Sequence, residues 1–477
     1  MSWLPPLDAL IDGRWVAGAR RFAVTDPLDG ALIAEVTDSD DAMVDGAVDA
    51  AARAFPGWRR RPAPERGRLL GQLGARMLAD ERRLAELCTR ENGKPLKEAI
   101  AEVRYAAGFL TWFAGEAERI YGETIPASSG AQRITVGREP VGPAALITPW
   151  NFPYAMLTRK LGAALAAGCT VVAKPAEATP LGALALAEIA QTVGIPAGVF
   201  NVVPAADGAR AGGRLVSAPA IRKVSFTGST EVGRLINRAC AADLKRVSLE
   251  LGGNAPFVVF ADADLDAAAA GAITAKFRNA GQTCVAVNRF IVEAPVAAAF
   301  TERLVARVAA LITGPGLAPT TDIGPLIDDA AVAKVTRLVA DALARGARLL
   351  LGTPPTGATR LIAPIVLDGI TPDMGLWREE VFGPVVALRT AVDEADAIAQ
   401  ANDTEFGLVA YAYTRDGSRQ VRVAEALEAG MVGINEGLVS TPQAPFGGIK
   451  QSGIGREGSR HGLDDYLQLK YVAARVG

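Results

Sequence analysis

Histidine and cysteine are scarce in this sequence. The 477 residues include one histidine, His461, and four cysteines, at positions 88, 169, 240 and 284. Such numbers exclude a disulfide framework and a zinc site built from cysteine and histidine, so we expect no metal site. A serine–histidine triad has little support, because the single imidazole lies near the C-terminal end of the sequence.

An excess of one charge and long apolar runs are also absent. Lys and Arg number 50 against 52 Asp and Glu, so the net charge is −2 and nothing favours nucleic acid or an anionic membrane as a partner. The best apolar run, Leu161–Ala173, is shorter than the roughly 20 residues that span a membrane. Asp8 and Asp12 stand where a signal peptide would be basic and then apolar. We therefore expect a cytoplasmic protein with free thiols.

What the sequence does contain is a repeated alternation of short apolar runs and helical segments. Between Ala144 and Leu251 this alternation predicts an α/β fold, with a parallel sheet covered by helices on both faces. One of these helices should be capped by Asn151 and should end at Gly168. A second α/β region should follow Leu251, and the polar segment Pro126–Pro140 predicts an exposed arm.

Cys284 is the best candidate for a nucleophile. It follows Gly281-Gln282-Thr283 in a predicted loop, where backbone N–H groups can lower the pKa of a thiol. The alternative is a buried structural cysteine, and we keep that interpretation for Cys88, Cys169 and Cys240.

Two further residues fit the chemistry of a thiol that attacks a carbonyl. The side-chain amide of Asn151 could donate to an oxyanion, or it could simply cap a helix. Glu250 ends a predicted strand, where a buried carboxyl would have a raised pKa and could act as a general base. The alternative for Glu250 is a salt bridge at a strand end.

Phosphate-binding signals are weak. The sequence lacks GxGxxG after its first strand and lacks GxxxxGK[ST] altogether. The segment Phe226–Ser229 does lead from a strand through a glycine turn into a helix N-terminus, where backbone N–H groups suit an anion.

Taken together, these segments resemble the aldehyde dehydrogenase superfamily from end to end. The matching motifs, in order, are Thr148–Pro153, Lys174–Glu177, Phe226–Thr230, Leu249–Gly253, Gly281–Cys284, Glu379–Pro384 and Pro445–Gly453. Within the superfamily the sequence is most similar to the succinate-semialdehyde dehydrogenases, through Met156–Thr170, Ser248–Phe260, Lys276–Cys284, Ile323–Ile327, Gln400–Leu408 and Gly455–Tyr471.

The resemblance implies a role for each of these residues. Cys284 would form a thiohemiacetal and then a thioester, with Asn151 and the Cys284 N–H binding the oxyanion. Glu250 would activate the hydrolytic water, with Glu457 as a possible auxiliary base. The residues implied in binding the cofactor are Trp150, Lys174, Glu177, Gly228, Ser229, Leu251, Glu380 and Phe382.

The resemblance also implies the architecture. A Rossmann-like cofactor domain would comprise residues 1–118 and 141–250, followed by an α/β catalytic domain at 251–444. A small β oligomerisation arm would comprise 119–140, and the C-terminal segment 445–477 would carry another oligomerisation strand. The arm and that strand, near Leu467–Val472, would pair across subunits of a homo-oligomer, either a dimer or a tetramer.

Two arginines and a serine indicate the substrate. In the succinate-semialdehyde dehydrogenases, the residues that match Arg159, Arg278 and Ser440 bind the substrate carboxylate, which an arginine can hold bidentately. We therefore expect oxidation of succinic semialdehyde, as in γ-aminobutyrate degradation. Glutarate semialdehyde, a broader aldehyde range and, in another class, a non-catalytic crystallin-like protein are the alternatives.

Glu177 indicates the cofactor. A carboxylate at the adenosine ribose accepts both hydroxyl groups and repels a 2′-phosphate. Relatives that prefer NADP often have a small neutral residue at this position. We therefore expect NAD to be preferred, with NADP possible.

Overall fold

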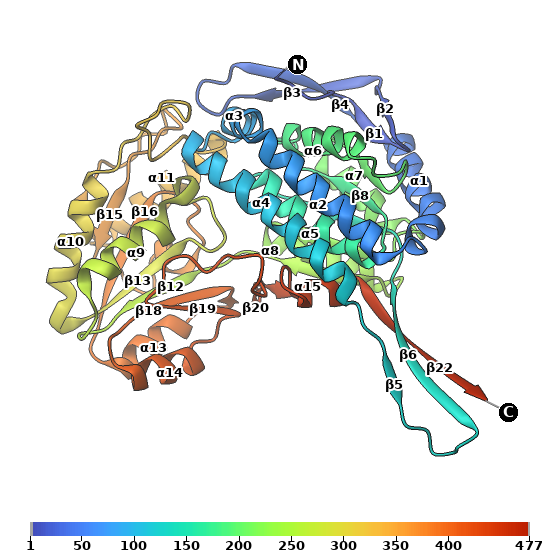
Figure 1. Ribbon diagram of the computed structural model, residues 1–477. Helices are drawn as coiled ribbons and strands as arrows, with labels where there is room; N and C mark the ends of the chain where they lie inside the picture. Colours follow the sequence, from blue (N-terminus) through green and yellow to red (C-terminus); the bar gives the residue numbers. More distant parts are fainter. Residues whose placement is uncertain (1–2, 476–477) are drawn as a thin grey trace.

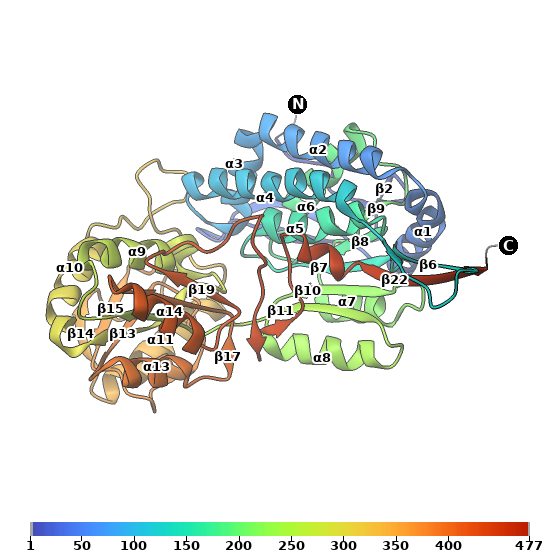
Figure 2. The same cartoon turned by 60° about the horizontal axis from the view of Figure 1, so that its bottom comes forward.

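The computed structural model describes residues 3–475, which form two large sheets with their helices and a projecting arm (Figures 1 and 2). The first sheet has the strand order β2 (Arg14–Val16), β1 (Ala9–Ile11), β9 (Phe200–Val202), β8 (Val171–Lys174), β7 (Ala144–Ile147), β10 (Lys223–Thr227), β11 (Arg246–Glu250) and β21 (Gly453–Ile454). The strands from β9 to β11 are parallel, as predicted, and β1, β2 and β21 pair antiparallel at the edges.

Helices cover both faces of this sheet because its central strands are apolar on both sides. In β8, Val171 and Ala173 pack into one core, while Val172 packs into another. The first core is formed with α2 (Ala63–Ala79), α3 (Glu81–Asn92), α4 (Leu96–Glu116), α5 (Pro153–Ala167) and α6 (Leu181–Thr192). The second is formed with α1 (Asp41–Arg59), α7 (Gly208–Ser217) and α8 (Thr230–Ala241).

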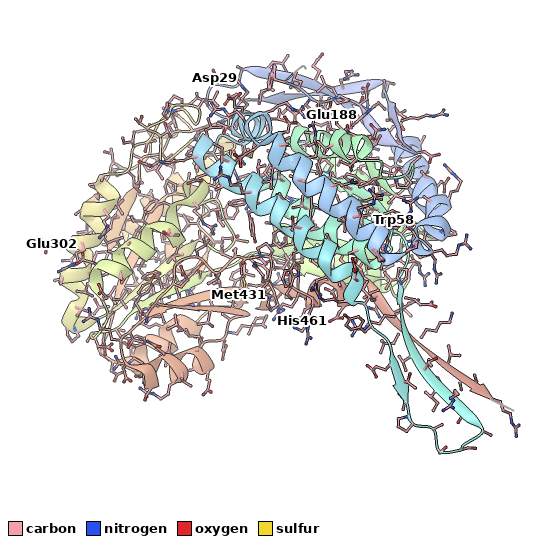
Figure 3. All side chains as sticks on the ribbon, viewed as in Figure 1. Asp29, Trp58, Glu188, Glu302, Met431 and His461 are labelled. Carbon is pink, nitrogen blue, oxygen red and sulfur yellow. The ribbon has the colours of Figure 1, made fainter. Side chains whose placement is uncertain are left out.

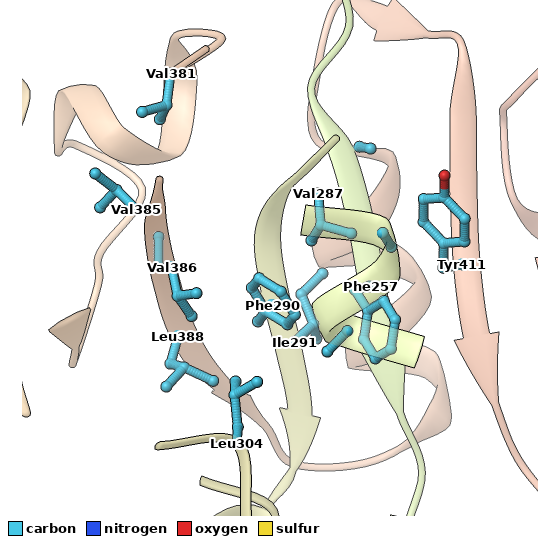
Figure 4. Packing of buried hydrophobic residues seen from close by; sticks show 14 of the residues in the cluster. Phe257, Val287, Phe290, Ile291, Leu304, Val381, Val385, Val386, Leu388 and Tyr411 are labelled. Carbon is cyan, nitrogen blue, oxygen red and sulfur yellow. The ribbon is translucent and has the colours of Figure 1, made fainter. Parts of the chain in front are cut away.

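The second large sheet is also mostly parallel. Its order is β14 (Arg348–Leu351), β15 (Ile365–Asp368), β16 (Val385–Ala391), β13 (Val287–Glu293), β12 (Ala255–Val259), β18 (Val409–Tyr413) and β19 (Met431–Ile434). Its helices are α9 (Leu265–Phe277), α10 (Ala297–Ala309), α11 (Asp329–Ala344), α12 (Gly375–Arg378), α13 (Glu394–Asn402) and α14 (Gly417–Ala426). Phe257 lies at the centre of the core, with its ring 5.3 Å from that of Phe290 (Figure 4).

The arm is a three-stranded antiparallel sheet that extends away from both large sheets (Figure 1). It consists of β5 (Glu123–Ile125), β6 (Gln132–Pro140) and β22 (Leu467–Arg475). Within the chain the C-terminal strand pairs with β6, from Leu467 opposite Pro140 to Arg475 opposite Gln132. The expected pairing of these segments across subunits stays a prediction.

Short elements complete the fold. They are the hairpin β3 (Arg20–Thr25) and β4 (Leu32–Asp38), the pair β17 (Phe406–Gly407) and β20 (Ile449–Lys450), the helix α15 (His461–Asp464), and the 3₁₀ turns Ala117–Arg119, Arg278–Gly281 and Ala294–Val296. The boundaries proposed for the domains stay a prediction. The structure shows in addition that the C-terminal segment contributes β21 to the first sheet, where it pairs with β11.

The start of α5 differs from the expected helix. The helix begins at Pro153 and Asn151 does not cap it: the Asn151 side-chain oxygen accepts no hydrogen bond from the described residues, and its nitrogen donates to the carbonyl oxygen of Gln282. The helix does end at Gly168, whose φ of 96° lies in the left-handed region. Among residues 3–475, no helix is long and apolar enough to cross a membrane. The cytoplasmic location stays a prediction.

Candidate active site

A cavity of about 380 Å³ is lined by loops from both large sheets. All the predicted site residues line it except Lys174, Glu177, Glu250 and Glu457. Those that do are Trp150, Asn151, Arg159, Gly228, Ser229, Leu251, Arg278, Cys284, Glu380, Phe382 and Ser440. His461 does not line this cavity. It lies in α15 near the base of the arm, where it pairs with Asp464 (Figure 3).

Cys284 lies in a strained loop after α9. Asn279, Ala280 and Gly281 all have left-handed φ angles, of 51°, 56° and 78°. Such conformations are costly for residues other than glycine and gather at functional sites. The neighbouring Gln282 accepts a hydrogen bond at 3.0 Å from Asn151 Nδ2. This nitrogen carries a second N–H, so Asn151 can still donate into the cavity beside Cys284.

The expectation that the pKa of the Cys284 thiol is lowered is wrong for the site without cofactor or substrate. Burial raises the pKa of Cys284 to about 12, and the charges of Glu380 and Glu250 add to the shift, although Arg159 opposes it. The sequence could not show this effect, because the burying residues come from segments far apart in the chain. The resting thiol therefore holds its proton at neutral pH.

The raised thiol pKa has a measurable consequence. Without cofactor or substrate, alkylation of Cys284 by iodoacetamide should accelerate about tenfold per pH unit between pH 7 and 9, because the reactive thiolate fraction grows in that proportion below the pKa. Peptide mapping by mass spectrometry measures the rate, and the buried Cys88 and Cys169 serve as internal controls. A plateau below pH 8 would mean that the thiol pKa is lowered after all.

Glu250 ends β11 with both carboxyl oxygens buried and unpaired within the described residues. Burial raises its pKa well above the ordinary value, and the negative charge of Glu457 adds to this, while Arg159 and Lys160 oppose it. The direction of this shift agrees with the raised pKa expected for this position. A raised pKa makes the ionised Glu250 carboxylate a stronger base than an ordinary one.

Glu457, in contrast to Glu250, is paired with cations and has a lowered pKa. It accepts hydrogen bonds from Arg159 Nε at 2.5 Å, from Lys160 Nζ and from Ser225 Oγ at 3.0 Å. Burial alone would raise its pKa, but Lys160 and Arg159 together lower it to about 2. A carboxylate this acidic is a poor proton acceptor, which argues against Glu457 as an auxiliary base.

Three buried hydrogen-bond donors in the cavity have no acceptor. Arg159 Nη1, Arg278 Nε and the hydroxyl of Tyr105 make no hydrogen bond of ordinary geometry with any described residue. The Tyr105 hydroxyl lies close enough to Ser440 and Arg159 for weak hydrogen bonds that fall short of ordinary geometry, and within electrostatic reach of Arg278. Buried donors without partners are costly, so this end of the cavity suits an anionic ligand. Sequence reasoning missed Tyr105, which belongs to no recognised motif; its position in α4 gave no signal.

The opposite end of the cavity lies where the strands of the first sheet end, the usual place for ligands in an open α/β sheet. Ser229 caps α8, accepting from the N–H of Val232 at 3.3 Å. The preceding Gly228 has no room for a side chain, because a Cβ there would lie 2.4 Å from the ring of Phe226. Its own N–H donates to the carbonyl of Glu250, so it is not free for a phosphate.

The other predicted cofactor residues surround this end. Glu380 accepts from the N–H of Gly253 at 3.1 Å, and burial raises its pKa to about 7. The Trp150 and Phe382 rings meet edge to face, with centroids 5.6 Å apart. Lys174 and Glu177 lie outside the cavity and pair at 3.4 Å, with the Glu177 side chain 54% exposed.

Comparison with known proteins identifies the family. The model of the aldehyde dehydrogenase family matches residues 15–472. The chain belongs to this family. The resemblance inferred from the motifs is thereby confirmed, and so is the aldehyde dehydrogenase fold.

Individual relatives of this family are similar over nearly the whole chain. The succinate-semialdehyde dehydrogenase [NADP(+)] of Escherichia coli (strain K12) is 52% identical over 467 residues, covering 97% of each chain. The glutarate-semialdehyde dehydrogenase of Pseudomonas putida (strain KT2440) is 51% identical over 98% of each. A crystal structure described as an E. coli NADP-dependent enzyme has a TM-score of 0.98 and 51% identity, covering 100% of this chain and 99% of that one.

Membership of the aldehyde dehydrogenase family implies a nicotinamide cofactor, and the residues present fit one. The helix N-terminus at Ser229 suits a pyrophosphate. The partly buried Glu380 carboxyl group, beside Gly252 and Gly253, suits ribose hydroxyl groups. Outside the cavity, Lys174 offers a hydrogen-bond donor and Glu177 an acceptor, which suit the adenosine ribose. When bound, the nicotinamide ring supplies the acceptor for the substrate hydride.

Proposed function

We propose that the protein oxidises succinic semialdehyde to succinate. The observation that carries this proposal is the set of three unpaired donors, on Arg159, Arg278 and Tyr105, in the same cavity as Cys284. A carboxylate at the far end of a short aldehyde would satisfy them while its carbonyl carbon lies at the thiol. The names of the E. coli and P. putida relatives agree with an aldehyde that carries a carboxylate.

Each step of the reaction has a residue to perform it. As the Cys284 sulfur bonds to the aldehyde carbon its proton passes to solvent, and Asn151 Nδ2 with the Cys284 N–H stabilises the resulting oxyanion. With a nicotinamide bound as acceptor, the thiohemiacetal would give up its hydride and become a thioester on Cys284. Glu250 takes a proton from water as that water attacks the thioester, and Cys284 leaves as the free thiolate.

A substrate panel tests the proposal. We expect kcat/KM to be highest for succinic semialdehyde, lower for glutaric semialdehyde and much lower for neutral butanal. The two acidic aldehydes differ by one methylene, which is worth only about 1–3 kcal/mol, whereas butanal leaves the buried donors unpaired. A kcat/KM for butanal equal to that for succinic semialdehyde would overturn the proposal. A higher value for glutaric semialdehyde would instead select that alternative.

Tyr105 should contribute to this selectivity. The Tyr105→Phe enzyme should lose roughly 10- to 150-fold in kcat/KM for succinic semialdehyde, because a hydrogen bond to a charged group is worth roughly 1.5–3 kcal/mol. Its activity with butanal should be unchanged, since the ring remains in place. Steady-state kinetics with both aldehydes measures the difference. Equal losses with both would make Tyr105 a packing residue.

For the cofactor we propose that NAD is preferred, on the basis of Glu177. Its exposed carboxylate beside Lys174 would repel a 2′-phosphate. The Glu177→Ser enzyme should therefore have a lower KM for NADP than the wild type. Its kcat/KM with NADP should rise relative to its kcat/KM with NAD. A wild-type kcat/KM that is higher with NADP than with NAD would count against Glu177 as the residue that determines cofactor preference. The name of the E. coli relative, which includes NADP(+), would agree with that result.

We also propose that the protein is a homo-oligomer assembled through its arm. Among residues 3–475 no strand pairs with the outer edge of β5 or of β22, and Tyr121, Leu469 and Tyr471 expose 61–70% of their surface on or beside the arm. Exposed apolar side chains on open strand edges are typical of association sites. Multi-angle light scattering that gave the monomer mass of 49.6 kDa would contradict this.

A further inference from the structure

A buried ion pair lies behind the turn that carries Asn151. Lys94, which follows α3, donates from Nζ to Glu102 of α4 at 2.5 Å, and neither side chain has any exposed surface. Neither residue lines the cavity. A buried ion pair is weak support for stability, because its desolvation offsets its attraction. We therefore look for the role of the Lys94–Glu102 pair in its contacts with the neighbouring backbone.

Lys94 holds the backbone of the turn. Its Nζ donates to the carbonyl oxygen of Asn151 at 2.7 Å and lies 3.9 Å from the centre of the Phe152 ring. The same carbonyl accepts from Asn279 Nδ2 at 3.1 Å, in the loop that leads to Cys284. One oxygen of Asn151 thus joins the buried lysine to the loop of the nucleophile.

Glu102 holds the other side of the turn. Its Oε1 accepts from the N–H groups of Tyr154 at 2.9 Å and Ala155 at 3.3 Å, in the first turn of α5. These are donors that a helix leaves unpaired, and no side chain next to α5 in sequence caps them. Glu102 therefore acts as the cap of α5 from a different helix.

We propose that Lys94 and Glu102 are positioning residues for the oxyanion site. Lys94 fixes the carbonyl before the turn and Glu102 fixes the N–H groups after it, so the Asn151 side chain is held toward Cys284. Pre-oriented donors are effective because they need no reorganisation during reaction. The inference rests on the proposed role of Asn151 as oxyanion donor.

The experiment separates positioning from folding. In the Lys94→Met enzyme, kcat with the fastest aldehyde of the substrate panel should fall about 10- to 100-fold, because a misplacement of about 1 Å has effects of that size. Alkylation of Cys284 by iodoacetamide, which forms no oxyanion, should keep its rate. The Kd of the cofactor should also be unchanged. The control is Lys97→Met, which removes an exposed lysine of α4 paired with Asp322.

A double variant makes the distinction sharper. Lys94→Met leaves Glu102 buried without its partner and should lower Tm, whereas Lys94→Met/Glu102→Gln removes both charges of the pair and should restore much of the lost Tm. The amide oxygen introduced by Glu102→Gln can still accept from α5, but nothing donates to the Asn151 carbonyl from the lysine side. We expect kcat to stay low in the double variant although Tm recovers.

Three results would overturn the inference alone. The first is a kcat that stays normal in Lys94→Met, the second is a kcat that recovers together with Tm in the double variant, and the third is an alkylation rate that falls in step with kcat. Asn151→Ala separates this failure from that of the proposed mechanism. A normal kcat in Asn151→Ala would remove the oxyanion role and the inference with it, whereas a low kcat there beside a normal kcat in Lys94→Met would remove only the inference.

Discussion

The Glu250→Gln enzyme should complete one turnover and then stall. The hydride step does not need the base, so reduced cofactor should appear in a burst that approaches one equivalent per site. The steady rate after the burst should be lower by about 10²–10⁴-fold, because the thioester then waits for water that no base activates. Stopped-flow absorbance of the reduced cofactor measures both phases.

Two variants control this result. Cys284→Ala should show neither burst nor steady rate, because a methyl group cannot form the thiohemiacetal. Glu302→Gln removes an exposed carboxylate on α10 and should behave as wild type. A Glu250→Gln enzyme that turns over steadily without a burst, at a rate near wild type, would show that another group activates the water.

The Arg278→Ala enzyme should lose roughly 10- to 150-fold in kcat/KM for succinic semialdehyde. A charge-assisted hydrogen bond is worth roughly 1.5–3 kcal/mol, and each 1.4 kcal/mol is about tenfold. Arg159→Ala should lose at least as much, but it also leaves Glu457 without one of its two cations. Arg278 is therefore the cleaner test, because no described residue forms an ion pair with it.

Steady-state kinetics with butanal is the control for both arginine variants. Butanal carries no carboxylate, so its kcat/KM should change little in Arg278→Ala. Arg303→Ala, on the outer helix α10, should leave both aldehydes unaffected. Equal losses for the two aldehydes in Arg278→Ala would mean that the arginine holds the loop of Cys284 rather than the substrate.

The fold was largely predictable because its signals are local. The apolar runs at β7, β8, β10 and β11 and the glycine that ends α5 appear directly in the sequence. The mistaken cap at Asn151 shows the limit of local reasoning. The sequence places Asn151 two residues before Pro153, but the N–H groups of α5 are capped by Glu102, some fifty residues earlier in the chain.

Most of the residues that line the cavity were predictable, but its electrostatics were not. Motifs identify Cys284, Glu250 and Asn151, whereas the pKa of a thiol depends on burial and on charges brought together by folding. The pairing of Glu457 with Arg159 and Lys160 joins positions almost 300 residues apart. Tyr105 and Lys94 were missed for the same reason, since each becomes informative only through its neighbours in space.

One measurement tests the central claim most directly. The Glu250→Gln enzyme is mixed with succinic semialdehyde and oxidised cofactor, quenched in acid, and examined by intact-protein mass spectrometry with peptide mapping. We predict one succinyl group per chain, on Cys284, which would identify the nucleophile, the oxidation and the substrate together. An unmodified protein after the burst, or a succinyl group on another residue, would contradict the account.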